Sequence, residues 1–178
     1  MKKNILQYAL ALALTALILL GLSVGLRPMA QANAEAARLE RMRTLLPGSV
    51  TFTQEAYTGE DANIRSVHKA ENGFVIETVT NGYVGEINAM IGVSNEGTVT
   101  GLVIQDIHET LGLGDRARTD WQFLMQFLWG KGDAEIGGNV DAIAGATVTS
   151  KAVARCVNSA VAYVTGADAG SSATEWGG

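Results

Sequence analysis

An uninterrupted apolar segment near the start of the chain, residues 5–26, most restricts how this sequence can fold. Its 22 residues include no charged side chain. A helix rises about 1.5 Å per residue, so this segment can cross the hydrocarbon core of a bilayer, about 30 Å thick. We therefore predict that residues 1–30 form a transmembrane anchor. The alternative is a cleavable signal peptide, because Ala32, Asn33 and Ala34 resemble a cleavage site, but a signal-peptide core usually has only about 7 to 15 apolar residues.

The segment that follows the anchor has the periodicity of an amphipathic helix. Its apolar residues fall on one side, and charged residues occupy the rest of its surface. Pro47 and Gly48 then end the pattern. We predict a juxtamembrane helix over residues 31–47, which serves as a stalk, as a helix on the membrane surface or as a contact with a membrane partner. The apolar side consists of Leu39, Met42, Leu45 and Leu46.

The charge balance excludes some classes of partner. From Gln31 onward the chain has 10 basic and 18 acidic residues, a net charge of −8. A domain of this charge has no electrostatic reason to bind nucleic acid or an anionic lipid surface. Basic residues lie on both sides of the apolar segment, Lys2 and Lys3 before it and Arg27 after it. Their positions therefore do not decide which end of the anchor faces the cytoplasm.

Residues 48–166 carry the pattern of one α+β domain with an antiparallel sheet and flanking helices. Short runs rich in Val, Ile, Thr and aromatic residues indicate strands. Asn72-Gly73 and Asn95-Glu96-Gly97 fall between such runs and are typical hairpin residues, because they tolerate positive φ. We expect an antiparallel meander. The predicted strands are residues 50–57, 64–70, 74–80, 83–93 and 98–107.

Two helices are predicted in the second half of this domain. The first covers residues 121–129, with Thr119 or Asp120 as its cap and an apolar side that we assign to the core. The second follows Ser150 and ends at Gly166, with Thr149 or Ser150 as its cap. Residues 167–178 are rich in Gly, Ser and Ala and are predicted to be a flexible tail. The core side of the first helix consists of Phe123, Leu124, Phe127 and Leu128.

The residues just before the second helix have the features of a phosphate site. Gly145 and Ala146 are small, so a ligand can approach the backbone there, and Thr147 adds a hydroxyl group. The free N–H groups and the positive end of the helix dipole both favour an anion at this position. On local physics alone, a ligand-free turn that leads into a capped helix is an equal alternative.

The same residues resemble a known modification motif. Asp141-Ala-Ile-Ala-Gly-Ala-Thr147 resembles the flavinylation motif Asp-x-x-Ser/Thr-Gly-Ala-Thr of the FMN-binding domain family. This domain occurs in the G subunit of the Rnf electron transport complex and in the C subunit of the sodium-pumping NADH:quinone reductase. The resemblance implies that a dedicated flavin transferase attaches FMN to Thr147 through a phosphoester. Ala144 departs from the motif, which usually has a hydroxyl residue there. The cofactor-binding residues expected here are Asp141, Gly145, Ala146, Thr147, Thr149 and Ser150.

A second stretch, residues 108–114, resembles the family's loop His-x-Glu-Thr-Pro-Gly-Leu-Gly, with Leu111 in place of proline. The resemblance implies that this loop lies beside the flavin ring. Gly112, Gly114 and Ala117 also fit a dinucleotide fingerprint, but no parallel βαβ unit surrounds them, so we reject a Rossmann site. The ring-side residues expected from the resemblance are Glu109, Thr110, Leu111, Gly112 and Leu113.

Tyr83 belongs to a third match, because Gly82-Tyr83-Val84-Gly85 resembles the family's Gly-Tyr-x-Gly. Two interpretations of Tyr83 are possible: packing across neighbouring strands, or a wall close to the flavin. The sequence leaves both open.

Cysteine and histidine content limits the chemistry. Cys156 is the sole cysteine and falls on the apolar side of the last helix, so we assign it to the core. His68 and His108 have no cysteine or carboxylate at metal-ligand spacing. We also find no arrangement of nucleophile, base and orienting group. We therefore assign no metal ligand and no catalytic residue, and expect that a cofactor carries any electrons.

The resemblance implies a membrane-anchored electron-carrier subunit of an Rnf-type ion-translocating ferredoxin:NAD oxidoreductase complex. It implies other membrane subunits as partners and an FMN domain on the extracytoplasmic side of the cytoplasmic membrane. Two other classes of function stay open. One is a free-standing extracytoplasmic FMN-dependent reductase, which would need a substrate pocket. The other is a non-redox anchored binding module, which would carry no flavin.

Overall fold

The computed structural model describes residues 2–167, and the chain divides into two compact units, Met1–Glu40 and Arg41–Gly178. Helix α1 (Lys2–Leu45) forms the described part of the first unit and continues into the second with its last turn. The predicted anchor and juxtamembrane helix are thus one continuous helix, with Pro28 inside it. By length and composition, α1 is the one helix within residues 2–167 that could cross a membrane. The predicted tail lies outside the described residues from position 168 onward.

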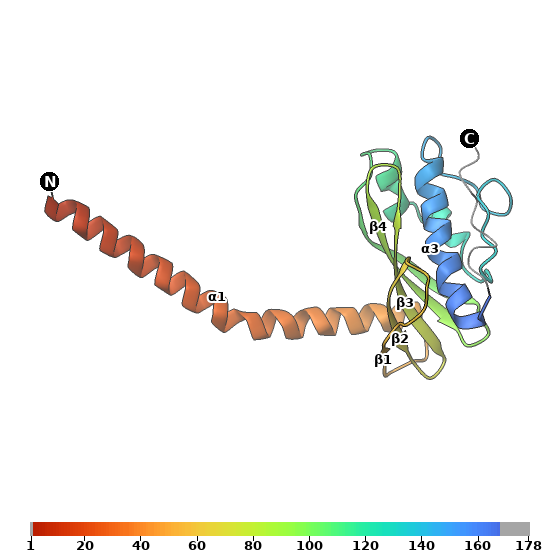
Figure 1. The fold of residues 1–178 in the computed structure, drawn as a ribbon, viewed down its shortest axis with the longest axis horizontal. Helices are drawn as coiled ribbons and strands as arrows, with labels where there is room; N and C mark the ends of the chain where they lie inside the picture. The colour runs from red at the N-terminus through yellow and green to blue at the C-terminus, as the bar shows by residue number, and fades with distance from the viewer. Residues whose placement is uncertain (1, 168–178) are drawn as a thin grey trace. The chain divides into compact units, whose positions relative to one another are not determined.

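The second unit contains a five-stranded sheet in which every strand pairs antiparallel with the next along the chain (Figure 1). The predicted meander is therefore confirmed. Gly73 and Gly97 occupy the two predicted hairpin turns with φ of 153° and 77°, values that other residues rarely adopt. The strands are β1 (Thr53–Glu55), β2 (Ile64–Lys69), β3 (Gly73–Asn81), β4 (Glu86–Ser94) and β5 (Val99–Ile107).

Helix α3 (Thr147–Thr165) covers one face of this sheet, which we call the front face (Figure 1). Ile76 and Ile91 are opposite one another on β3 and β4, and both are fully buried beneath the helix. Gly166 ends α3 in the left-handed conformation with φ of 70°, as predicted. Cys156 is buried within this front core, also as predicted.

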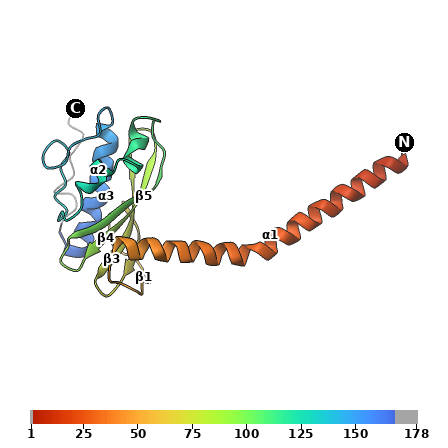
Figure 2. The ribbon, with the colours of Figure 1, turned by 180° about the vertical axis from the view of Figure 1, so that it is seen from behind.

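The opposite face, the back face, receives the last turn of α1 (Figure 2). Met42, Leu45 and Leu46 are buried there in a small second core. A Cβ atom on Gly101 would lie 2.7 Å from the Leu45 Cα, and the Thr100 hydroxyl donates a 2.6 Å hydrogen bond to the Leu45 carbonyl. Three of the four residues predicted for the apolar side of the juxtamembrane helix, Met42, Leu45 and Leu46, therefore belong to the core of the second unit.

Two short helical segments connect β5 to the loop before α3. They are η1 (Gly114–Arg118) and α2 (Trp121–Met125). Asp120 caps α2, since its Oδ1 accepts from the Phe123 N–H at 3.2 Å. The helix is shorter than the predicted span of 121–129, because the N–H groups of Gln126, Phe127 and Leu128 bond to the carbonyls three residues earlier, in turns rather than an α-helix. The chain then pairs with Val99 at the start of β5 through Trp129 (φ 68°). The predicted core side is confirmed by Phe123 and Phe127, whose buried rings are 5.1 Å apart.

Candidate functional site

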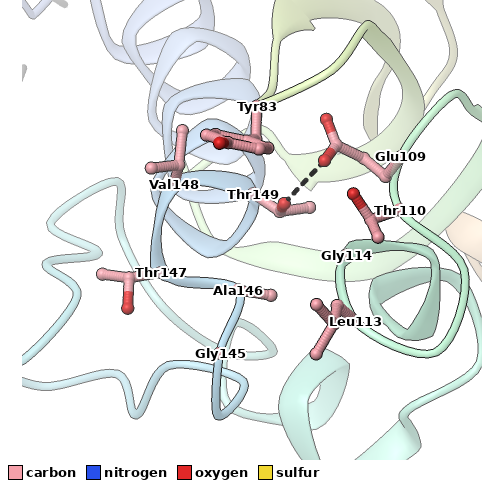
Figure 3. A pocket seen from close by; sticks show the side chains of 10 residues that line it. All are labelled: Tyr83, Glu109, Thr110, Leu113, Gly114, Gly145, Ala146, Thr147, Val148 and Thr149. Atoms are coloured by element: carbon pink, nitrogen blue, oxygen red, sulfur yellow. Dashed lines mark hydrogen bonds between the residues drawn. The ribbon is translucent and has the colours of Figure 1, made fainter.

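Three segments that are distant in the sequence meet around one pocket of about 320 Å³ (Figure 3). They are the β3–β4 turn, the loop after β5 and the first turn of α3. The volume falls in the range of ordinary small-molecule sites, which starts at about 300 Å³. The pocket is lined by Tyr83, Glu109, Thr110, Leu113, Gly114, Gly145, Ala146, Thr147, Val148 and Thr149.

Thr147 is the first residue of α3, and its side chain is exposed to solvent. The N-cap residue before it, Ala146, makes no side-chain hydrogen bond to the helix. The first N–H groups of α3 therefore have neither intrahelical carbonyl partners nor a side-chain cap. Gly145, with φ of 76°, makes the left-handed turn that brings the chain to this point. Thr147 therefore lies at the uncapped N-terminus of α3, where the positive end of the helix dipole favours an anion.

The predicted capping role of Thr149 and Ser150 is wrong. The helix begins at Thr147, so both residues lie inside its first turn and are 1% and 0% exposed. The Thr149 hydroxyl donates to Glu109 Oε2 at 3.0 Å, and the Ser150 hydroxyl donates to the Ala146 carbonyl at 2.9 Å. Ser150 also accepts from the Ile143 N–H at 3.0 Å. The hydroxyl groups of Thr149 and Ser150 thus make hydrogen bonds within the fold, whereas Thr147 is exposed to solvent.

Glu109 joins two of the pocket segments to each other. Its Oε1 accepts from the Val84 N–H in the β3–β4 turn at 3.1 Å, and its Oε2 accepts from Thr149 on α3 (Figure 3). A Cβ atom on Gly114 would lie 2.8 Å from that same Oε2, and one on Gly82 would collide with Oε1. The two glycines therefore leave the space that the carboxylate fills.

Tyr83 extends from the β3–β4 turn to the pocket and is 72% exposed. It precedes the first residue of β4, Glu86, so it has no partner across the sheet. The interpretation of Tyr83 as a cross-strand packing residue is therefore wrong. Tyr83 lines the pocket, and a position close to the flavin stays a prediction.

Several predicted site residues lie outside this pocket. Leu111 is 87% exposed at the tip of the loop, and the neighbouring Gly112 has φ of 77° with no atom near its missing Cβ. Asp141 is exposed, and Ser150 is buried beneath the first turn of α3. The prediction missed two lining residues, Gly114 and Val148. Gly114 ends the loop that the sequence had singled out, whereas Val148 carries no chemical signal of its own.

Other reactive groups do not contribute to the pocket. Burial raises the pKa of the Cys156 thiol, so this group stays protonated within the core, 3.3 Å from the Thr80 hydroxyl. Within residues 2–167, no group of three or more His, Cys, Asp or Glu side chains is placed to hold a metal ion. The distinctive chemistry of the site is therefore the exposed Thr147 hydroxyl at a helix N-terminus beside a concave surface.

Comparison with known families agrees with this geometry. The FMN-binding domain family matches residues 82–162, which include all three segments of the pocket. The fold and site thus define an FMN-binding domain preceded by a candidate membrane helix.

Individual relatives give a more specific result. The G subunit of the ion-translocating oxidoreductase complex of Pseudomonas aeruginosa (strain UCBPP-PA14) is 32% identical, over 91% of this chain and 89% of the relative. The corresponding G subunit of Methanosarcina acetivorans is 36% identical over 70% and 73%. The G subunit of the Na(+)-translocating ferredoxin:NAD(+) oxidoreductase complex of Acetobacterium woodii is 38% identical over 50% and 47%. The chain belongs to the family formed by the G subunits of ion-translocating oxidoreductase complexes.

Proposed function

We propose that this protein is a membrane-anchored electron carrier that holds FMN through a phosphoester on Thr147. The observation that carries the proposal is the contrast among three neighbouring hydroxyl groups. Thr149 and Ser150 are buried and hydrogen-bonded, whereas Thr147 is exposed beside the pocket. Of the three, Thr147 alone can be reached by a modifying enzyme without unfolding α3.

The residues around the pocket fit FMN. The uncapped start of α3 suits the phosphate, because its N–H groups and dipole favour an anion. Tyr83 and Leu113 offer apolar surface to the isoalloxazine ring. FMN supplies the electron-transfer chemistry, and the protein supplies retention and position. Glu109 adds a negative charge that disfavours an anionic reduced flavin.

Attachment needs an activated donor, because a free phosphate would have to lose water to form the ester. In a flavin dinucleotide, the Thr147 hydroxyl oxygen forms a bond to the phosphorus of the FMN moiety. The pyrophosphate P–O bond breaks, adenosine monophosphate leaves, and the hydroxyl proton passes to solvent. A flavin transferase would catalyse this step. The adduct equals FMN less one water, and no electron is transferred during attachment.

We also propose a location for the protein, and the length and apolar character of α1 support the anchor. Residues 1–30 would stay attached as a single-pass anchor in the cytoplasmic membrane, with the FMN domain on the extracytoplasmic side. There an ester bond keeps the flavin from diffusing away. The names of the relatives describe ion-translocating complexes, one of them a ferredoxin:NAD(+) oxidoreductase. We assign this chain the same role, with the other membrane subunits of such a complex as its partners.

The test of the proposal is flavin fluorescence from denatured protein. The full chain, coexpressed with a flavin transferase, should give a fluorescent band on a denaturing gel, because only covalent flavin survives denaturation. The same chain without the transferase should give none. A non-fluorescent band in both samples contradicts the proposal that the flavin is covalently attached.

The anchor has a separate test. Mass analysis of the mature protein should recover the N-terminal peptide, because the apolar segment is long enough to span the membrane. A mature chain that starts at Glu35 would show that the segment is a signal peptide.

A further inference from the structure

The three hydroxyl groups in the first turn of α3 have different surroundings. That of Thr147 belongs to an exposed residue beside the pocket. That of Ser150 is buried and accepts from the Ile143 N–H, in the loop before the helix. That of Thr149 reaches another element, the loop after β5, and donates to Glu109 Oε2 at 3.0 Å (Figure 3). Of the three, the Thr149 hydroxyl is therefore the one that contacts the loop expected beside the flavin ring.

The Glu109 carboxylate is a negative charge that neutral donors hold in place. Its Oε1 accepts from the Val84 N–H at 3.1 Å, and its Oε2 accepts from Thr149. Within residues 2–167, no lysine, arginine or histidine forms an ion pair with it. The side chain is partly buried, so a carboxylate oxygen that lost its donor there would be poorly solvated. The two neutral hydrogen bonds therefore decide where this charge lies in the pocket.

Gly114 leaves the space in which the Thr149 hydrogen bond forms. A Cβ atom on Gly114 would lie 2.6 Å from Thr149 Oγ1 and 2.8 Å from Glu109 Oε2. A side chain at this position would therefore displace one of the two partners. Gly114 is itself buried, so the contact belongs to a packed junction between α3 and the loop after β5.

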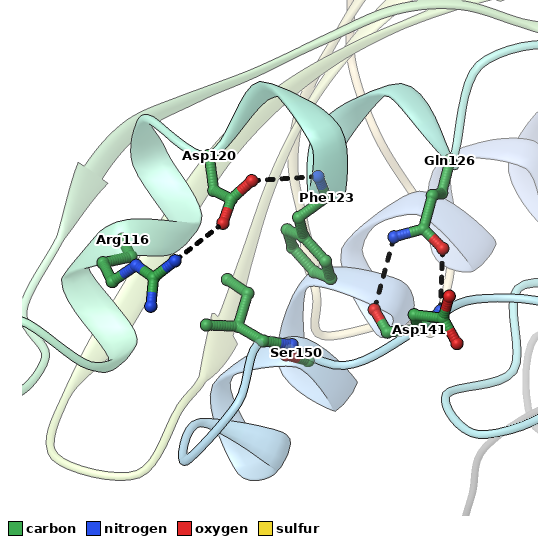
Figure 4. Close-up of polar contacts among 7 residues, drawn as sticks. Arg116, Asp120, Phe123, Gln126, Asp141 and Ser150 are labelled. Atoms are coloured by element: carbon green, nitrogen blue, oxygen red, sulfur yellow. Dashed lines mark hydrogen bonds and ion pairs between the residues drawn. The ribbon is translucent and has the colours of Figure 1, made fainter.

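The start of α3 is also held by contacts that do not involve Thr149. Ser150 bonds to the loop that precedes the helix. Further back along this loop, Gln126 accepts from the Asp141 N–H at 2.8 Å and donates to the Asp141 carbonyl at 3.3 Å (Figure 4). Loss of the Thr149 hydroxyl should therefore loosen the loop after β5 while Thr147 keeps its place.

We infer that Thr149 is a positioning residue, which holds the Glu109 carboxylate beside the flavin ring and so lowers the reduction potential of the flavin. This inference rests on the proposed attachment of FMN to Thr147. Two hydroxyl groups of one helical turn then have separate tasks, since Thr147 carries the phosphate and Thr149 fixes the charge near the ring. Thr149 acts through Glu109 rather than on the phosphate.

The first measurement needs no flavin. Hydrogen exchange of the flavin-free full chain in detergent should be faster in residues 82–85 and 108–114 of Thr149→Val, because the carboxylate that joins these segments loses a donor. Thr149→Ser keeps a hydroxyl group and should exchange at the wild-type rate. Thr165→Val is the matched control on the same helix, because the Thr165 hydroxyl donates to the Val161 carbonyl within α3.

The second measurement is the reduction potential of the flavinylated chain, by redox titration. In Thr149→Val, Glu109 Oε2 loses its donor and the carboxylate turns towards water, where its charge is screened, so the potential should rise. Thr149→Ser and Thr165→Val should match the wild type. Thr149→Val should add no further rise to that of Glu109→Gln, because glutamine has no charge for Thr149 to position.

The two substitutions of Thr149 separate positioning from packing. Valine keeps the shape of threonine but lacks the hydroxyl group, whereas serine keeps the hydroxyl group and lacks a methyl group. A positioning role predicts the larger change in Thr149→Val, and a packing role predicts the larger change in Thr149→Ser.

The outcomes distinguish this inference from the proposed function. If the wild type carries no covalent flavin, the proposed function is wrong, and the inference falls with it whatever the exchange rates are. If the wild type is flavinylated but Thr149→Val keeps the wild-type exchange or potential, or changes less than Thr149→Ser, the inference alone is overturned. Loss of attachment in Thr149→Val would also overturn it, because Thr149 would then act at the phosphate.

Discussion

Met90 and Ile91 are neighbours on β4 and are both fully buried, yet they belong to different cores. Successive side chains of a strand point to opposite faces of the sheet. Ile91 faces α3 in the front core, which supports the pocket, whereas Met90 faces the last turn of α1 in the small back core. The front face thus builds the site, and the back face attaches the sheet to the end of the candidate membrane helix.

The two faces differ in how they accept their helix. On the front face, large apolar side chains fill the space beneath α3. On the back face, Gly92 and Gly101 remove side chains so that the backbone of Leu45 can approach the sheet. One sheet can therefore support the site on one face and the end of α1 on the other, since changes to one face need not disturb the other.

The largest change in the free energy of unfolding is expected from substitutions that leave cavities in the two cores. Ile91→Ala should lower the free energy of unfolding by about 4 kcal/mol and Met90→Ala by about 2 kcal/mol, because the larger front core has less freedom to collapse around a cavity. Urea unfolding of the full chain in detergent measures both. Ile91→Ala should also slow flavin attachment, whereas Met90→Ala should not. Equal slowing by the two variants would show that the faces are not independent.

A smaller change in stability is expected from a substitution at the contact between β5 and α1. Gly101→Ala places a Cβ atom 2.8 Å from the Leu45 carbonyl oxygen, so the helix end must shift, at a cost of about 1 to 3 kcal/mol. Trypsin should then cut faster after Arg41 or Arg43. Gly21→Ala is the matched control, because nothing lies within 4 Å of its new Cβ atom. Unchanged proteolysis in Gly101→Ala would mean that the glycine is not needed to seat the helix.

The smallest expected change in free energy is a shift of the flavin reduction potential, caused by a substitution of Glu109. Glu109→Gln can keep both contacts, since the amide oxygen accepts from Val84 and the amide nitrogen donates to Thr149. It removes one negative charge near the expected ring position. The reduction potential should rise by about 20 mV for a two-electron couple, on the order of 1 kcal/mol, while Thr147 stays flavinylated. Redox titration of both flavinylated proteins measures the shift. An unchanged potential, or a folded variant that cannot be flavinylated, would remove this loop from the ring's surroundings.

The sequence could predict the features that depend on neighbouring residues. The hairpin at Gly73, the helix stop at Gly166 and the cap at Asp120 each follow from the backbone preferences of a few adjacent residues. The exposed Thr147 was also reached from the sequence, through the pattern of the motif.

The features that the sequence could not predict depend on distant segments. Thr149 looks like a cap, but Glu109, forty positions earlier, accepts its hydroxyl hydrogen inside the helix. Gln126 clamps Asp141 from another element, and no local pattern marks that pair. Leu45 looks like part of a free amphipathic helix until the glycines of β4 and β5 are in place beside it.

Tandem mass spectrometry of the peptide that contains Thr147, Thr149 and Ser150 shows whether Thr147 is the sole attachment point of FMN. Wild-type protein coexpressed with a flavin transferase should carry the mass of FMN less one water on Thr147. The Thr147→Ala variant should carry no adduct, because the other two hydroxyls are buried and hydrogen-bonded. An adduct that maps to Thr149 or Ser150, or that persists in Thr147→Ala, would show that Thr147 is not the sole attachment point.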